Sequence, residues 1–270
     1  MIELTIGIVT YNDYNGLYFT LQALRLYHDL EKTELLIVDN YGCERTRALA
    51  QESGSRYILA IETVGTAAAK EIVFRAAIGQ AVLCCDCHVL LVPGSVARLR
   101  KYFREHPCSD DLLQGPLLHD DGSGLSTHQE PKWQGLMWGL WATDPRGVDP
   151  SGEPFEISMQ GMGTFSCRKT AWLGFHPKFR GFGGEEGYIH EKFRRAGRRC
   201  LCLPWFRWMH RFQTPSDVSY PNTIEDRIRN HILANVELGF SLEPLVAHFR
   251  QYIPEDDIVS LSLEALFENR

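Results

Sequence analysis

The sequence lacks the features that define membrane-spanning, fibrous and disordered proteins. None of its 270 residues belongs to a run of about 18 consecutive apolar residues, the length that a membrane-spanning helix needs. Internal repeats and low-complexity segments are also missing. A composition of 44% hydrophobic and 23% charged residues is ordinary for a globular protein. We therefore expect a globular chain without integral membrane contact.

Cysteine is too sparse for a disulfide scaffold, with eight residues over the whole chain. Three of them, Cys84, Cys85 and Cys87, crowd one apolar segment. A signal peptide would begin with lysine or arginine, whereas this chain carries Glu3 and runs directly into a β-rich segment. These features predict a reduced, cytoplasmic compartment.

The glycine-rich loops that bind nucleotide phosphates are absent as well. No GxGxxG follows the first β-rich segment, and GxxxxGK[ST] does not occur anywhere. The sequence therefore disfavours both a dinucleotide-binding domain and a P-loop protein. A diphosphate ligand would need another source of positive charge.

Charge is unevenly distributed along the chain. The net charge of −6 disfavours a protein that binds nucleic acid over its whole surface. Residues 168–211 nevertheless hold eleven lysines and arginines against three glutamates. Such a basic segment indicates either a local anionic ligand, such as a phosphate group, or a solvated helix face.

The first hundred residues alternate between β-rich and helical patterns. Strands are expected at 4–10, 34–39, 56–61 and 81–85, and helices around 17–24 and over 44–53, 66–78 and 94–106. Strand–helix units at this spacing imply right-handed crossovers and a parallel sheet. The sequence therefore predicts a doubly wound α/β fold, with a mainly parallel sheet and helices on both faces.

The rest of the chain is less regular. Residues 110–154 are rich in Gly, Pro and Asp and are expected to form a long irregular segment, the kind that often binds ligands. After it we expect strands over 157–168 and 199–204 and a helix over 185–196. An amphipathic helix over 223–238 and two shorter helical patterns predict a C-terminal helical extension over residues 221–270.

Asp86 and His88 come directly after the fourth predicted strand. In open α/β sheets, ligands bind beyond the carboxyl ends of the strands. A carboxylate with an imidazole two residues later suits Mn²⁺ or another first-row ion better than Mg²⁺. A divalent ion there would supply the missing positive charge. The alternative is that Asp86 caps a turn and His88 merely packs.

Five segments resemble the family 2 glycosyltransferases of the GT-A fold, in that family's order and spacing. The segments are TIGIVTYN at 5–12, LIVDN at 36–40, the helix start at 65–77, AVLCCDCHVL at 81–90 and FGGEEGYIHEKFRRAG at 182–197. The DxH form of the fourth is typical of polypeptide N-acetylgalactosaminyltransferases. The resemblance covers about residues 3–212. It implies a GT-A domain over residues 1–220, with a nucleotide-binding half at 1–109 and an acceptor and catalytic half at 110–220.

The resemblance also implies roles for particular residues on the donor side. Five of them match positions that face the nucleotide: Thr10, Tyr11, Asn12, Asp39 and Lys70. Asp86 and His88 would bind the metal, and His210 falls where the N-acetylgalactosaminyltransferases place a third ligand, a histidine. By itself, a lone histidine is more often a packed or surface residue.

On the acceptor side, Glu186 aligns with the usual general base of inverting members of the family, where it replaces an aspartate. Glu185 aligns with a glutamate that binds sugar hydroxyls. Both could instead be acids favoured by a helix N-terminus. Gly161 and Gly163 could let a sugar approach the backbone. Trp133 could stack on a sugar ring or belong to the core.

The implied activity is metal-dependent transfer of a sugar from a nucleotide-sugar donor, a UDP-sugar in the first instance, to an acceptor hydroxyl. The acceptor is left open between a glycan, a protein side chain and a hydroxymethylated base in DNA. Stereochemistry is open too, because the glutamate pair favours inversion whereas the DxH motif and His210 match a retaining group. The alternatives are a nucleotidyltransferase of related fold and a non-catalytic sugar-binding module.

Overall fold

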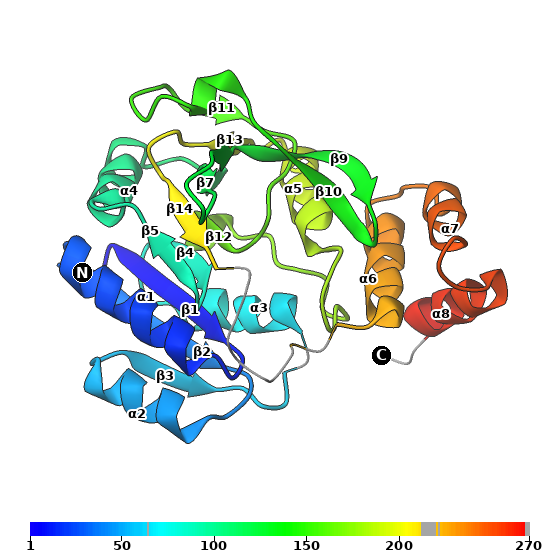
Figure 1. The fold of residues 1–270 in the computed structure, drawn as a ribbon, viewed down its shortest axis with the longest axis horizontal. Helices are drawn as coiled ribbons and strands as arrows, with labels where there is room; N and C mark the ends of the chain where they lie inside the picture. Colours follow the sequence, from blue (N-terminus) through cyan, green and yellow to red (C-terminus); the bar gives the residue numbers. More distant parts are fainter. Residues whose placement is uncertain (64, 212–219, 221, 268–270) are drawn as a thin grey trace.

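The computed structural model of the chain describes residues 1–63, 65–211, 220 and 222–267. An eight-stranded sheet forms its framework, in the order β11-β13-β6-β12-β4-β1-β2-β3 (Figure 1). The strands of this sheet are β1 (Leu4–Thr10), β2 (Thr33–Asp39), β3 (Arg56–Leu59), β4 (Ala81–Asp86), β6 (Leu112–Gln114), β11 (Phe155–Glu156), β12 (Thr164–Arg168) and β13 (Cys200–Cys202).

The N-terminal half of the sheet is parallel, as predicted. β1 pairs in parallel with β2 and β4, and β2 pairs in parallel with β3. The register places Thr10 beside Asp39 and Val9 beside Asp86. The polar residues that end these strands therefore meet at one edge of the sheet. β12 then runs antiparallel to both β4 and β6, which makes the sheet mainly, but not wholly, parallel.

Helices cover both faces of the sheet. They are α1 (Tyr14–Tyr27), α2 (Glu44–Glu52), α3 (Thr66–Ala76), α4 (Ser95–Glu105), α5 (Glu185–Arg195), α6 (Ile224–Glu237), α7 (Glu243–Phe249) and α8 (Glu255–Phe267), with 3₁₀ turns at Pro145–Gly147 and Lys169–Ala171. None of the helices in the described part of the chain combines the length and the apolar character needed to cross a membrane. All eight cysteines are free thiols.

Two hydrophobic cores lie on the two faces. One buries the apolar sides of α1, α2 and α4 against β1, through residues such as Leu17, Leu49 and Leu99. The other contains α3 and α5 and extends through Ile232 of α6 to Phe249 of α7. The C-terminal helices, on the right of Figure 1, therefore share a core with the sheet.

Residues 110–154 contain more regular structure than the sequence predicts. They include β7 (Leu117–Leu118), β8 (Leu125–Ser126) and an antiparallel hairpin of β9 (His128–Gln134) and β10 (Met137–Ala142). The expectation of a long irregular segment was therefore wrong for the hairpin.

The strand expected over 157–168 is present only in its second half, as β12, because residues 157–163 form a loop.

A smaller sheet places the turn after β4 beside β14. Its order is β5-β14-β7-β8, where β5 is Val89–Leu91 and β14 is Trp208–His210. β14 runs antiparallel to β5, with His210 opposite Val89. Two histidines that are 122 residues apart in sequence, His88 and His210, are thereby placed side by side.

Candidate active site

A cavity of about 470 Å³ opens at the carboxyl edge of the parallel strands. Most of the site residues expected from the sequence line it: Thr10, Tyr11, Lys70, Asp86, His88, Gly161, Gly163, Glu185, Glu186 and His210. They come from the ends of β1 and β4, from α3, from the loop before β12, from the first turn of α5 and from β14. The fold therefore gathers residues from six separate segments into one place.

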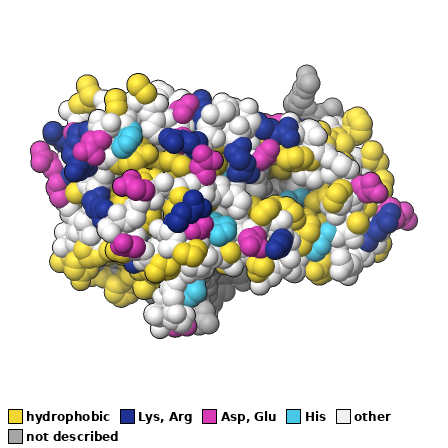
Figure 2. All heavy atoms as spheres, turned by 90° about the horizontal axis from the view of Figure 1, so that it is seen from above, with side chains coloured by type: hydrophobic (Ala, Val, Ile, Leu, Met, Phe, Trp, Pro, Cys, Tyr) yellow, Lys and Arg dark blue, Asp and Glu magenta, His cyan; other side chains and the backbone are white. Residues whose placement is uncertain are grey.

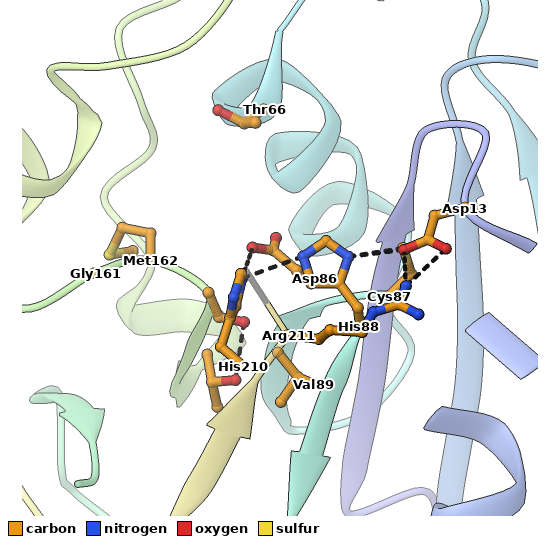
Figure 3. Close-up of polar contacts among 12 residues, drawn as sticks. Asp13, Thr66, Asp86, Cys87, His88, Val89, Gly161, Met162, His210 and Arg211 are labelled. Carbon is orange, nitrogen blue, oxygen red and sulfur yellow. Dashed lines mark hydrogen bonds and ion pairs between the residues drawn. The ribbon is translucent and has the colours of Figure 1, made fainter. Parts of the chain in front are cut away.

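Asp86, His88 and His210 point toward one another (Figure 3). One ligand atom from each lies within 4.8 Å of the others. The two Nε2 atoms of the histidines are 3.2 Å apart, and Nε2 of His210 is 3.5 Å from Oδ2 of Asp86. The end of β4 supplies the carboxylate, the turn after it supplies one imidazole, and β14 supplies the other.

A buried lysine holds the other oxygen of Asp86. Nζ of Lys70 lies 3.1 Å from Oδ1 of Asp86 and donates to the carbonyl oxygen of Met162 at 2.8 Å. Burial alone would raise the pKa of Asp86, but the charge of Lys70 and the bond with His210 hold that pKa well below its usual value. Asp86 is therefore ionised and oriented, with Oδ2 left facing the two imidazoles.

The two histidines sit in different electrostatic surroundings. Burial disfavours the charged form of His88, yet the hydrogen bond with Asp13 raises its pKa to about 10. Burial lowers the pKa of His210. Without an ion, the proton on His88 helps to neutralise the carboxylates around it. A divalent cation would take the place of that proton.

The donor set fits a first-row divalent ion. Two imidazole nitrogens and one carboxylate oxygen converge, and nitrogen-rich sets of this kind suit Mn²⁺ and its neighbours better than Mg²⁺. Three protein ligands leave further coordination positions for oxygens of a ligand or of water. The set carries one formal negative charge, so a bound divalent ion would keep a net positive charge for a diphosphate.

Glu185 and Glu186 enter the cavity from the first turn of α5. Two glycines with positive φ, Gly183 at 103° and Gly184 at 91°, turn the chain sharply into this helix. Because side chains with a Cβ rarely adopt such angles, glycine is required there. Oε1 of Glu185 accepts a hydrogen bond of 2.7 Å from Thr66 at the start of α3.

Glu186 has a different environment, although it is adjacent in sequence. Its side chain is buried, and burial together with the charge of Glu185 raises its pKa to about 8. Lys70 and Arg227 act in the opposite direction. A carboxyl group with a pKa near neutrality can exchange a proton with a substrate, which is what acid–base catalysis requires.

Three expected site residues are not among the described residues that line this cavity. The buried carboxylate of Asp39 accepts hydrogen bonds from the amides of residues 41–43 and from the hydroxyl of Tyr57, so in this conformation it shapes the loop after β2. Asn12 lies in the turn after β1, with φ of 50°. Trp133 lines a second cavity, of about 490 Å³, on the other side of α5. Contacts of these residues with a substrate stay predictions.

Other residues reach the cavity without having been expected from the sequence. Seven that line it are Asp13, Asn40, Thr66, Gln129, Trp141, Tyr220 and Asn222. Arg227 of α6 approaches from behind them and donates to Oδ1 of Asn222 and to the sulfur of Met137. Three of them had a signal in the sequence. Asn40 and Thr66 lie in the segments 36–40 and 65–77 that resemble the family, and Trp141 is, like Trp133, a tryptophan of residues 110–154 that could stack on a sugar ring.

The basic segment at 168–211 is largely neutralised by carboxylates. Its cations form ion pairs with carboxylates inside and outside the segment: Arg180 with Asp226, Lys192 with Glu237, Arg194 and Arg195 with Glu191, Arg198 with Asp110, Arg199 with Asp111, and Arg211 with Asp13. Figure 2 shows basic and acidic side chains interspersed over the face that it presents. The segment therefore gives no support to a DNA acceptor.

Comparison with known proteins identifies the family. Residues 5–166 match the model of glycosyl transferase family 2, and the chain belongs to this family. No curated protein matches the chain in sequence.

Several solved structures share the fold, and one of them is a mannosyltransferase. The chain resembles GalNAc-T7 in complex with UDP, GalNAc and Mn²⁺, with a TM-score of 0.71 and 15% identity over 97% of this chain and 53% of that one. It resembles Staphylococcus aureus TarS 1–349 with UDP-GlcNAc (TM-score 0.56, 16% identity, 98% of this chain and 73% of that one). The mannosyltransferase PcManGT of Pyrobaculum calidifontis, with GDP-Man and Mn²⁺, gives a TM-score of 0.54 and 14% identity over 98% of this chain and 74% of that one. The chain thus spans about half the length of the GalNAc-T7 structure.

These comparisons confirm the predicted α/β GT-A fold.

Proposed function

We propose that this chain is a metal-dependent glycosyltransferase that moves a sugar from a UDP-sugar to an acceptor hydroxyl. One observation carries the proposal: Asp86, His88 and His210 converge beside a cavity into which Glu185 and Glu186 also project. The first group would hold a cation, and the second would transfer a proton. Glycosyl transfer from a nucleotide sugar needs both, one for the leaving group and one for the acceptor.

The donor would bind at the carboxyl edge of the parallel strands. Thr10 and Tyr11 would contact the nucleoside, with Asp39 and Asn12 behind them, and Lys70 would add positive charge near the phosphates. Asp86, His88 and His210 would hold a divalent ion, Mn²⁺ before Mg²⁺. Such an ion would supply positive charge to the departing diphosphate. Residues 1–109 would then be the nucleotide-binding half and residues 110–220 the acceptor and catalytic half.

On the acceptor side, Glu186 would act as the general base. The acceptor hydroxyl gives its proton to the carboxylate of Glu186 while its oxygen forms a bond to the anomeric carbon. The bond from that carbon to the phosphate oxygen breaks, and its electron pair leaves with the nucleoside diphosphate. Glu185, fixed by Thr66, would bind a sugar hydroxyl. A Cβ at Gly161 would lie 3.0 Å from Trp141, and one at Gly163 would lie 3.0 Å from His210, so the glycines make room for these two side chains. Approach of the sugar to the backbone of Gly161 and Gly163 stays a prediction.

The ligands of the structural neighbours support this assignment. GalNAc-T7 was solved with UDP and Mn²⁺, TarS with UDP-GlcNAc and PcManGT with GDP-Man and Mn²⁺. Membership of glycosyl transferase family 2 favours sugar transfer over the nucleotidyltransferase and sugar-binding alternatives.

Calorimetry of UDP binding with and without Mn²⁺ tests the proposal. The wild-type protein should bind UDP much more tightly when Mn²⁺ is present. His210→Ala should remove most of this dependence, whereas His106→Ala, which changes an exposed histidine at the end of α4, should retain it. Unchanged Mn²⁺-dependent binding in His210→Ala would contradict the three-ligand site.

A further inference from the structure

Asp13 lies on the side of His88 that faces away from the metal group (Figure 3). Asp13 is 5% exposed, and its carboxylate is held by contacts from three directions. Oδ2 lies 3.0 Å from Nδ1 of His88, and Oδ1 accepts the amide of Gly16 at 2.9 Å as the N-cap of α1. Nη2 of Arg211 lies 2.9 and 2.7 Å from the two oxygens.

The bond from Asp13 decides which nitrogen of His88 faces the metal group. A neutral imidazole carries a proton on one nitrogen and a lone pair on the other. Since Oδ2 of Asp13 can only accept, Nδ1 of His88 must be the donor. The lone pair of the neutral ring is then on Nε2, which is the atom beside His210 and Asp86. Metal-binding histidines are commonly oriented by a carboxylate in this way.

Arg211 extends this arrangement to the second histidine. Its backbone amide donates to the carbonyl oxygen of His88 at 3.2 Å, while its side chain binds Asp13. Arg211 directly follows His210 in the sequence. The turn after β1, the turn after β4 and the end of β14 are therefore tied together by Asp13 and Arg211.

We propose that Asp13 is a positioning residue for the metal site, an inference that rests on the proposed function. Its carboxylate fixes the ring and the tautomer of His88, and through Arg211 it fixes the backbone that carries His210. In this role Asp13 would act through His88 and Arg211 and would not bind the ion itself. The sequence gives little sign of this role, because Asp13 is 75 residues before His88.

A second cation at Asp13 is the main alternative. One ligand atom each from Asp13, Cys87 and His88 lie within 4.8 Å of one another. The guanidinium of Arg211, however, already contacts both oxygens of Asp13, and a cation added there would lie against another positive charge. The geometry therefore favours hydrogen-bonded orientation of His88, with one ion per chain.

A simple capping role is the other alternative. An aspartate at an N-cap contributes roughly 0.5–2 kcal/mol to stability, and serine and asparagine cap about as well. Asp13→Ser thus keeps a cap for α1, but its side chain is too short to hold Nδ1 of His88 and Arg211 together. Asp13→Asn keeps the size of the side chain and loses its charge. The two variants separate capping from orientation of His88.

The proposal is tested by titrating the protein with Mn²⁺ alone and measuring the free ion by its electron paramagnetic resonance signal. Replacing a residue that orients a metal ligand typically weakens metal affinity 10–100-fold. We expect one ion per wild-type chain, a loss of this size in Asp13→Ser and a smaller loss in Asp13→Asn. Asp111→Ser is the matched control, because Asp111 is equally buried and binds Arg199 with both oxygens at the opposite edge of the sheet.

The possible results separate this inference from the proposed function. Thermal melting should show that the variants are folded at the temperature of the titration. Wild-type affinity in Asp13→Ser would overturn the positioning role and leave the metal site intact. Two ions in the wild-type protein, with one lost in Asp13→Ser, would establish the second cation site instead. If the wild-type protein bound no Mn²⁺, either alone or with UDP, the metal-dependent function would fail, and this inference with it.

Discussion

Two adjacent glutamates, Glu185 and Glu186, have different environments because helical geometry turns successive side chains about 100° apart. Glu185 reaches Thr66 on α3 and is fixed by its hydrogen bond. Glu186 is buried, and its neighbour's charge disfavours its ionisation. The first is suited to holding a hydroxyl group, and the second to accepting a proton from one.

Glu186→Gln should retain donor binding and lose transfer. The change keeps the size of the side chain but removes the base, while the metal ligands and the nucleotide pocket are untouched. General-base catalysis typically contributes about 10²–10⁴-fold, so kcat should fall within this range. Steady-state kinetics of sugar transfer, with UDP affinity as the control, measure the effect.

Glu185→Gln is the matched comparison. It should raise KM more than it lowers kcat, because a hydroxyl-binding carboxylate acts in the ground state as well as in the transition state. The assignment of the pair would be reversed if Glu185→Gln abolished transfer while Glu186→Gln kept it.

The raised pKa of Glu186 also predicts a pH dependence of stability. A carboxyl group with a pKa near 4.5 in the unfolded chain and about 8 in the folded protein binds more protons when folded. Through this group, the free energy of unfolding decreases as pH rises from about 4.5 to 8. Glu186→Gln should therefore be more stable than the wild-type protein at pH 8.5, with a smaller difference at pH 4.5.

Urea denaturation at the two pH values measures this difference. Glu153→Gln, at an exposed position, should show no such pH-dependent gain. An equal effect of Glu186→Gln at both pH values would mean that folding does not raise the pKa of Glu186.

At the scale of elements, helix α6 fixes the turn that leads into α5. Nδ2 of Asn230 donates to the carbonyl oxygens of Arg180 and Gly183 at 2.7 and 2.9 Å, and its Oδ1 accepts the amide of Arg180 at 3.1 Å. These bonds satisfy the backbone of the glycine turn from which Glu185 and Glu186 project. A helix outside the region matched by the family model thus positions the two glutamates to which we assign catalysis and sugar binding.

Asn230→Ala should lower both stability and transfer. Leaving buried backbone groups without partners costs roughly 1–3 kcal/mol, and a loosened turn displaces Glu186 from the acceptor. We expect a reduced kcat with nearly unchanged affinity for Mn²⁺, because the proposed metal ligands lie on β4, on the turn after it and on β14. Asn235→Ala, further along α6, should leave kcat unchanged. A loss of Mn²⁺ affinity equal to the loss of kcat would contradict this separate role.

Local sequence patterns predicted the elements with strong periodicity and missed those that depend on distant partners. The β-rich run at 4–10 and the helix after Thr223 need no tertiary information to be recognised. β9 contains Pro131 and Lys132, which are unusual in strands, and forms because β10 pairs with it. In the loop at 157–163, Gly161 and Gly163 interrupt an apolar run that otherwise resembles a strand.

In the candidate active site, too, the residues that belong to local motifs were predicted, and those that depend on distant partners were missed. Asp86 and His88 were found from their position after a strand, and His210 from a resemblance in order and spacing. Asp13 and Arg227 were missed, because each acts across more than 70 residues of sequence, on His88 and Met137 respectively. Neither belongs to a motif that spacing along the chain could reveal.

At the scale of the whole molecule, the sheet holds the site because both of its faces are tightly covered. A Cβ added at Gly7 of β1 would lie 2.0 Å from Cγ1 of Val73 on α3, so strand and helix are in close contact there. Gly7→Ala should force them apart and destabilise the fold by at least the roughly 1–3 kcal/mol that overpacking usually costs. Gly124→Ala, where an added Cβ meets only ordinary contacts, is the control in chemical denaturation. Equal stability of the two variants would contradict the close packing of β1 on α3.

Hydrolysis of a panel of nucleotide sugars, with Mn²⁺ or with a chelator, tests the central claim most directly, because it needs no knowledge of the acceptor. The account predicts slow release of nucleoside diphosphate from one class of donor, UDP-sugars, only when Mn²⁺ is present. Asp86→Ala should abolish this release. Cleavage between the two phosphates, which yields a nucleoside monophosphate, or release that continues in the chelator would contradict a metal-dependent glycosyltransferase.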